Sequence, residues 1–174
     1  MDADRRAVLE ATAKTWLQWN FGWKGGEWWY STIRPCLFLE EELDLPDDHP
    51  GEFKFHTVNG RVTHFHVNWF TPEGRSTSIY DRDLAFLDLR YKKWPSARKE
   101  LRSKVADLIS VAEELAKGID YVRVDLYLDR NETIWIGELT FAPANALGRY
   151  SSREFEIACC EGWDISTYLR PATW

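Results

Sequence analysis

The sequence has few cysteines, and their arrangement limits the chemistry they can support. Cys36, Cys159 and Cys160 are the three in the chain, and they form no Cys-x-x-Cys pair. An odd number without paired spacing argues against a disulfide framework and fits a reducing compartment. We therefore predict a cytoplasmic protein. The sequence reveals no neighbour that would activate Cys159 as a nucleophile.

Clustered basic residues and long apolar runs are also missing. The chain has 22 Lys and Arg against 28 Asp and Glu, a net charge of -6, whereas duplex binding requires clustered lysine and arginine against the phosphates. No apolar run approaches the roughly 20 residues of a membrane-spanning helix. The first residues, Met-Asp-Ala-Asp-Arg-Arg, do not resemble a secretory signal. We expect a protein that binds no nucleic acid and has no membrane span.

The chain does contain enough apolar material for one core. Its 174 residues, 44% of them hydrophobic, suit a single domain over residues 1–174. Hydrophobic periodicity and turn residues predict helices at 2–19, 95–117 and 152–160, a short buried strand at 35–43, hairpins at 52–69 and 121–141, and a loop at 71–83. Two hairpins, each associated with a helix, indicate an α+β fold in which helices back a sheet.

The hairpin at 121–141 carries charges on one of its faces. If the turn falls at Asp-Arg-Asn-Glu, Arg123 lies opposite Glu138, and Asp125 lies diagonal to Glu138 at about 7 to 8 Å. Thr140 shares this face. The other face is apolar and consists of Val122, Val124, Leu126 and Leu128 against Trp135, Leu139 and Phe141. One face is therefore core, and the other gathers two carboxylates, a guanidinium and a hydroxyl.

Two acids at that separation repel each other, and a divalent cation between them would relieve the repulsion. Mg²⁺ takes oxygen ligands and is commonly held by one or two carboxylates plus substrate phosphates, while Arg123 suits an anionic oxygen. The alternative is a solvated sheet face with one cross-strand ion pair, worth roughly 0.2 to 1 kcal/mol. The pattern alone leaves both interpretations open.

The hairpin at 52–69 turns at an Asn-Gly pair and contains a His-x-His motif. A two-residue turn pairs Phe55 with His64, so His64 and His66 share one face and His56 falls on the other. A zinc site would then have no third ligand. We therefore expect packed or surface histidines here.

The hairpin segments Y-V-R-V-D-L-Y and I-G-E-L-T-F resemble the signature of the TupA-like ATP-grasp family, which is associated with cell-surface polysaccharide and teichuronopeptide synthesis. Upstream segments resemble the same family in the same order, among them G-E-W-W-Y-S-T-I-R-P-C-L-F-L-E-E, E-F-K-F-H-T-V-N-G-R and I-Y-D-R-D-L. The resemblance implies an ATP-grasp-like antiparallel or mixed sheet of hairpins backed by helices. It begins after the family's glycine-rich loop, which implies a chain lacking the N-terminal lobe.

The resemblance also implies the cofactors ATP and Mg²⁺ and a role for each matching residue. It makes Asp125, Glu138 and Thr140 metal ligands, with Thr140 standing where the wider superfamily usually has asparagine. Arg123 would steady the transferring phosphoryl group or the acyl-phosphate. The positions implied to contact the nucleotide are Glu40, Glu42 and Leu43 at the adenine hinge, Glu52 at the ribose, and Lys54, whose part is undefined.

By this resemblance the chain is the Mg-nucleotide-binding domain of a carboxylate-amine ligase that acts through an acyl-phosphate in polysaccharide or peptide-like modification. Its substrates would be carboxylate and amine small molecules or saccharides. A homodimer or a partner chain would supply the missing lobe. The alternatives are a truncated, non-catalytic module of the same fold that binds a ligand or partner protein, and an unrelated α+β binding module.

Overall fold

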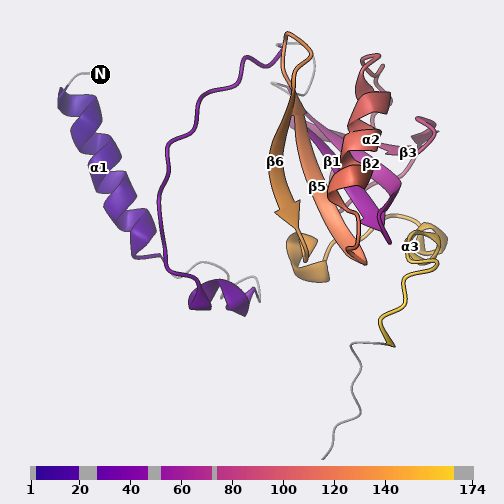
Figure 1. Ribbon diagram of the computed structural model, residues 1–174. Helices are drawn as coiled ribbons and strands as arrows, with labels where there is room; N and C mark the ends of the chain where they lie inside the picture. Colours follow the sequence, from indigo (N-terminus) through magenta and orange to yellow (C-terminus); the bar gives the residue numbers. More distant parts are fainter. Residues whose placement is uncertain (1–2, 20–26, 47–51, 72–73, 167–174) are drawn as a thin grey trace, which may run out of the picture. The chain divides into compact units, whose positions relative to one another are not determined.

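The computed structural model describes residues 3–19, 27–46, 52–71 and 74–166, which form two compact units, Met1–Glu42 and Leu43–Trp174 (Figure 1). The elements of the first unit are α1 (Ala3–Leu17) and the short helix η2 (Trp28–Thr32). The second unit holds β1 (Glu52–Val58), β2 (Arg61–Thr71), β3 (Gly74–Asp81), β4 (Phe86–Leu87), α2 (Val105–Leu115), β5 (Tyr121–Leu128), β6 (Ile134–Thr140), η3 (Pro143–Ala146) and α3 (Arg153–Cys159). Among the described residues, no helix has both the length and the apolar character needed to cross a membrane. That the whole chain is one domain stays a prediction.

The first unit confirms the predicted N-terminal helix but not the strand after it. Residues 35–43 have no regular secondary structure, and almost all of them are exposed. A strand needs a neighbour for its backbone N–H and C=O groups, and no described strand pairs with this segment. The apolar residues of this segment predicted a buried strand, and that prediction is wrong.

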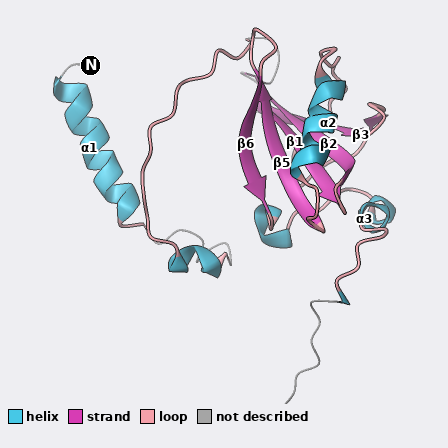
Figure 2. Cartoon of the chain, viewed as in Figure 1, coloured by secondary structure: helices cyan, strands magenta, loops and turns pink. Residues whose placement is uncertain are grey.

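The second unit is built on a six-stranded sheet in the order β4-β3-β2-β1-β5-β6, in which every neighbouring pair is antiparallel (Figure 2). Helix α2 contacts β5, β1 and β2 and covers one face of the sheet. Its apolar residues recur at helical spacing, and Val105, Leu108, Ile109 and Ala112 are buried. The predicted α+β fold of hairpins backed by a helix is confirmed.

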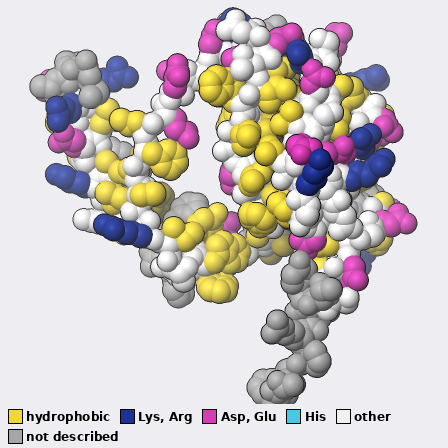
Figure 3. Space-filling view, viewed as in Figure 1, with side chains coloured by type: hydrophobic (Ala, Val, Ile, Leu, Met, Phe, Trp, Pro, Cys, Tyr) yellow, Lys and Arg dark blue, Asp and Glu magenta, His cyan; other side chains and the backbone are white. Residues whose placement is uncertain are grey.

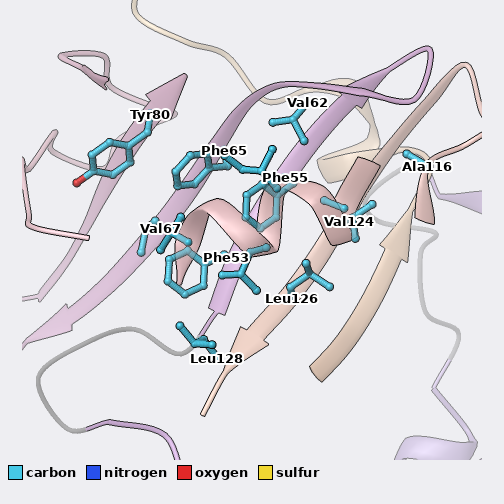
Figure 4. Packing of buried hydrophobic residues seen from close by; sticks show 14 of the residues in the cluster. Phe53, Phe55, Val62, Phe65, Val67, Tyr80, Ala116, Val124, Leu126 and Leu128 are labelled. Carbon is cyan, nitrogen blue, oxygen red and sulfur yellow. The ribbon is translucent and has the colours of Figure 1, made fainter. Parts of the chain in front are cut away.

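The core lies between α2 and the sheet. Strands alternate their side chains between two faces, and the face toward α2 carries rings and branched aliphatic groups such as Phe53, Phe55, Phe65, Val124 and Leu126 (Figure 4). Each of these side chains is almost fully buried. The opposite face of the same strands is therefore left for the polar residues between them.

Strand β6 does not complete this core as the sequence suggested. Trp135, Leu139 and Phe141 remain exposed, and hydrophobic side chains are visible over this edge of the sheet (Figure 3). Leu139 is exposed because β6 is the edge strand and α2 lies over β5, β1 and β2. Trp135 pairs with Tyr127 and therefore lies on the face opposite the core. The apolar face predicted for the whole hairpin is buried on β5 only.

Two other boundaries differ from prediction. Residues 74–81, expected to be part of a loop, form β3, which pairs with β2 along its length. Helix α2 begins at Val105 rather than near residue 95, because Pro95 and Ala97 make backbone hydrogen bonds with Thr77 of β3 at 3.0 and 3.3 Å. The segment before α2 thus forms an isolated bridge to β3 instead of starting the helix.

Candidate functional site

The hairpin of β5 and β6 brings the predicted metal ligands together, in a different register from the predicted one. Asp125 pairs directly with Glu138, and Arg123 pairs with Thr140. The predicted pairing of Arg123 with Glu138 is wrong by two positions. Next to the turn the strands are already offset by one residue, since Leu128 pairs with Ile134, and the bulge at Gly137 adds a second offset. Together the two offsets make the two carboxylates direct rather than diagonal neighbours.

Gly137 also leaves room for a neighbouring ring. A Cβ atom on Gly137 would lie 2.5 Å from Cε2 of Tyr127. We expect Gly137→Ala to displace the Tyr127 ring and to lower the free energy of unfolding by about 1 to 3 kcal/mol. Urea denaturation measures this loss of stability. The same substitution in a Tyr127→Leu background should cost clearly less; equal costs in both backgrounds would show that the ring is not the cause.

Asp125 lies at the centre of the charged face. Its side chain is only 1% exposed, and its oxygens accept hydrogen bonds from Lys54 Nζ at 2.6 Å and from Arg123 Nε and Nη2 at 2.6 and 2.8 Å. Lys54 reaches it because β1 pairs with β5 and places Lys54 opposite Asp125. A buried carboxylate is thus held between two cations.

The network continues to both sides of Asp125. On β1, Lys54 Nζ lies 2.8 Å from Glu52 Oε1, which also accepts a hydrogen bond from the Tyr127 hydroxyl at 3.1 Å. These contacts join six of the predicted site residues, Glu52, Lys54, Arg123, Asp125, Glu138 and Thr140, on one face of three adjacent strands. Tyr127 was not among the predicted site residues, although it alternates with Asp125 along the strand.

On β6, Thr140 links the guanidinium to the second acid. Its Oγ1 accepts a hydrogen bond from Arg123 at 2.9 Å and donates one to Glu138 at 2.7 Å. The Glu138 carboxylate is 3.7 Å from Arg123 and is 56% exposed. Of the two paired acids, Glu138 is therefore accessible to solvent and Asp125 is enclosed.

The electrostatics of this face follow from burial and charge. Burial lowers the pKa of Arg123, but its hydrogen bonds and attraction to Asp125 outweigh burial and leave the pKa raised. Burial, together with Glu52, raises the pKa of Tyr127 to about 12. Three carboxylates face two side-chain cations, so the face carries one negative charge in excess.

The predicted adenine hinge lies apart from this network in the chain. Glu40 and Glu42 belong to the first unit and are exposed, and Leu43 begins the second unit and is partly buried. The three have no strand conformation. Their contact with a nucleotide stays a prediction.

A second cluster of polar residues lies on the same sheet face, and the sequence predicted it only in part, with His64 and His66 on one face and His56 on the other. The register of β1 and β2 shifts between His56 and Thr57, so His56 pairs with His64 rather than facing away from it. Burial lowers the pKa of His64 to about 3. Burial and the nearby charge of His64 also lower the pKa values of His56 and His66. The expectation that His56 lies on the other face is wrong.

The environment of Cys159 also differs from expectation, because its Sγ lies 3.4 Å from His64 Nδ1. Burial raises the pKa of this thiol to about 12. The histidine is thus close enough to contact the sulfur, but the thiol stays protonated near neutral pH. This geometry does not make Cys159 an activated nucleophile.

Comparisons with known proteins found two solved structures and one family model that match the chain. Two structures of the ATP-grasp ligase PsnB, one with a phosphomimetic variant of its minimal precursor, Mg and ADP and one with the minimal precursor, resemble 60% of this chain at 16% identity, with TM-scores of 0.31 and 0.30. The chain covers 27% and 28% of those chains. No curated protein matches it. The model of the TupA-like ATPgrasp family matches residues 5–161, and the chain therefore belongs to the TupA-like ATP-grasp family.

Proposed function

We propose that the charged face of β1, β5 and β6 binds a nucleotide with Mg²⁺, and that the chain serves as the nucleotide-binding domain of an ATP-grasp carboxylate-amine ligase. The observation that carries the proposal is the connected network of Lys54, Arg123, Asp125 and Glu138. A nucleotide needs cations against its phosphate oxygens, and its metal needs oxygen ligands. This face offers both kinds of group side by side.

The donor set of this face fits magnesium. Asp125 and Glu138 are direct cross-strand partners, and one or two carboxylates with substrate phosphates are the usual ligands of Mg²⁺. Lys54 and Arg123 occupy the Asp125 oxygens, and we infer that nucleotide phosphates attract these cations away from the carboxylate. When bound, Mg²⁺ would neutralise charge on the phosphates during transfer.

The remaining roles follow from the same arrangement. Arg123 offers a planar guanidinium for the transferring phosphoryl group or an acyl-phosphate, and Thr140 orients both Arg123 and Glu138 through its hydroxyl. Lys54 binds phosphate, and Glu52 takes the ribose hydroxyls. We assign the adenine to the segment of Glu40, Glu42 and Leu43. Catalysis then rests on positioning and charge neutralisation.

The wider role is part of the proposal. The substrates are a carboxylate and an amine, on small molecules or saccharides, in a cytoplasmic step of polysaccharide or peptide-like modification. A second copy or a partner chain completes the nucleotide clamp. Sedimentation of the chain at micromolar concentration tests the second-copy version directly, and a strict monomer would contradict it.

Calorimetric titration with a non-hydrolysable ATP analogue, with and without Mg²⁺, tests nucleotide binding. We expect Mg²⁺-dependent binding by the wild type and at least a tenfold loss in Glu138→Gln, about the effect of removing one charge-assisted ligand. Glu114→Gln is the matched control, because Glu114 is an exposed glutamate of α2, 69% accessible and paired with Lys117. Equal affinities of the two variants would remove Glu138 from the site.

One observation favours a second candidate, a non-catalytic module that binds a ligand or partner protein. Asp125 is enclosed and its charge is compensated by Lys54 and Arg123, so these contacts give the carboxylate a structural role that requires no cofactor. Phosphate release from ATP across mixtures of carboxylates and amines separates the two. Release that requires both substrates supports the ligase, and nucleotide binding without release supports the module.

A further inference from the structure

Three imidazoles meet beside the charged face, at the junction of β1 and β2. His56 comes from β1, and His64 and His66 come from β2. One ring nitrogen of each histidine lies within 4.8 Å of those of the other two, and the residues are only 8%, 3% and 3% exposed. The rings of His56 and His64 stack with centroids 4.4 Å apart, and those of His56 and His66 are 4.8 Å apart. The cluster is compact enough for its members to share one small ligand.

The rings are held in place by two tyrosines. The Tyr150 hydroxyl lies 2.5 Å from His64 Nε2 and 2.6 Å from His66 Nε2, and the Tyr121 hydroxyl lies 2.9 Å from His56 Nδ1. A hydroxyl has one proton, so Tyr150 can donate to only one of its two histidines and must accept from the other. Buried, neutral and oriented imidazoles are the form in which histidine binds transition metals.

A cavity of about 300 Å³ opens beside the cluster. Its walls include His56, His64, Tyr121, Tyr150 and Cys159. The cavity gives an ion a route to the imidazoles and leaves space for a water or a small ligand next to them. A packed hydrophobic core would leave no such space.

We propose that His56, His64 and His66 form a binding site for one zinc-type divalent cation, each providing one ring nitrogen, with the fourth position facing the cavity. Three histidines with an open fourth position are an established zinc arrangement. With Zn–N bonds of about 2.0 to 2.1 Å, two nitrogens on a tetrahedral ion lie about 3.4 Å apart. The chosen nitrogens therefore have to approach by at most roughly 1.4 Å from the observed limit. The rings of His56 and His64, now stacked at 11°, also have to tilt so that both lone pairs point at the ion, and the Tyr150 hydroxyl gives up any nitrogen that the ion takes.

This site is chemically distinct from the proposed magnesium site. Mg²⁺ prefers oxygen ligands, whereas imidazole nitrogen suits zinc and its transition-metal neighbours. Both sites lie on one face of the sheet, but they share no ligand. The test therefore uses the metal alone, without a nucleotide. A failure to bind zinc would leave the nucleotide proposal standing, and a failure to bind nucleotide would leave the zinc proposal standing.

The test is equilibrium dialysis of metal-free full-length protein against micromolar Zn²⁺ near pH 7.5, with bound zinc measured by elemental analysis. We expect one zinc per chain in the wild type and an affinity loss above about 100-fold in His66→Asn, because losing a direct ligand should exceed the 10- to 100-fold effect of outer groups. His49→Gln is the control, since His49 is the one histidine of the sequence that does not belong to the cluster. It should leave binding unchanged, as should Glu138→Gln.

Folding is monitored separately, because His66 is buried. Zn²⁺ should raise the thermal unfolding midpoint of the wild type, and Co²⁺ should give the visible absorption of a tetrahedral nitrogen site. If His66→Asn does not fold, these two wild-type measurements and His56→Gln decide the question. The proposal is overturned if the wild type binds no zinc at tens of micromolar Zn²⁺, or if the His49→Gln variant no longer binds zinc.

Discussion

Replacing Asp125 with alanine is expected to lower the free energy of unfolding by about 3 to 5 kcal/mol, the usual cost of removing one member of a buried charge pair. The carboxylate is 1% exposed and accepts hydrogen bonds from both Lys54 and Arg123. Without it, two cations are left close together on a partly buried face with no central counter-charge. Urea denaturation monitored by tryptophan fluorescence measures the loss.

Two further variants separate this effect from general damage to the sheet. Glu138→Ala should cost less than about 1 kcal/mol, because exposed ion pairs contribute little and Glu138 is 56% exposed. Adding Lys54→Met to Asp125→Ala should recover part of the stability, since one uncompensated charge is removed. If Asp125→Ala and Glu138→Ala cost the same, the difference in burial does not determine their contributions.

Acidification should destabilise the protein before its carboxylates titrate. Burial lowers the pKa of His64 from 6.5 to about 3, and the pKa values of His56 and His66 are also well below 6.5. The unfolded chain therefore binds more protons than the folded chain below pH 6.5. Stability that is present above this pH is lost as the pH falls toward the folded values.

The size of the pH effect can be bounded. Each histidine contributes at most roughly 1.4 kcal/mol per pH unit, so the three together reach about 4 kcal/mol per unit. The positive charges of Lys54 and Arg123 also lower the pKa values of His56 and His66, and that of Arg75 lowers the pKa of His66. Urea denaturation at pH 7.5, 6.5, 5.5 and 4.5 measures the slope. A flat profile between pH 6.5 and 5 would contradict the prediction, and a folded His66→Asn variant should flatten the slope by about one third of this bound.

Much of the sheet was predictable because its hairpins are specified locally. The Asn-Gly turn has positive φ angles of 50° and 76° at Asn59 and Gly60, as the sequence pattern indicates. The β5–β6 hairpin likewise follows from alternation. Strand β3 was missed because its residues are typical of turns, and its conformation depends on pairing with β2.

The candidate site was predictable in part for the same reason. Alternation identified which polar side chains of 121–141 share a face. The bulge after His56 shifts the first predicted register by one residue, whereas the bulge at Gly137 and an offset at the turn shift the second by two. The contact between Lys54 and Asp125 depends on β1 lying beside β5. Residues 71 positions apart give no local signal of such a pairing.

The central position of β1 has a mechanical consequence. Lys54 and His56 are two residues apart on this strand and point to the same face, so one strand supplies a member to the charged network and a member to the imidazole cluster. Both groups sit on a rigid backbone bonded on each side. A displacement of that single strand would move the lysine and the histidine together, whichever ligand had caused it.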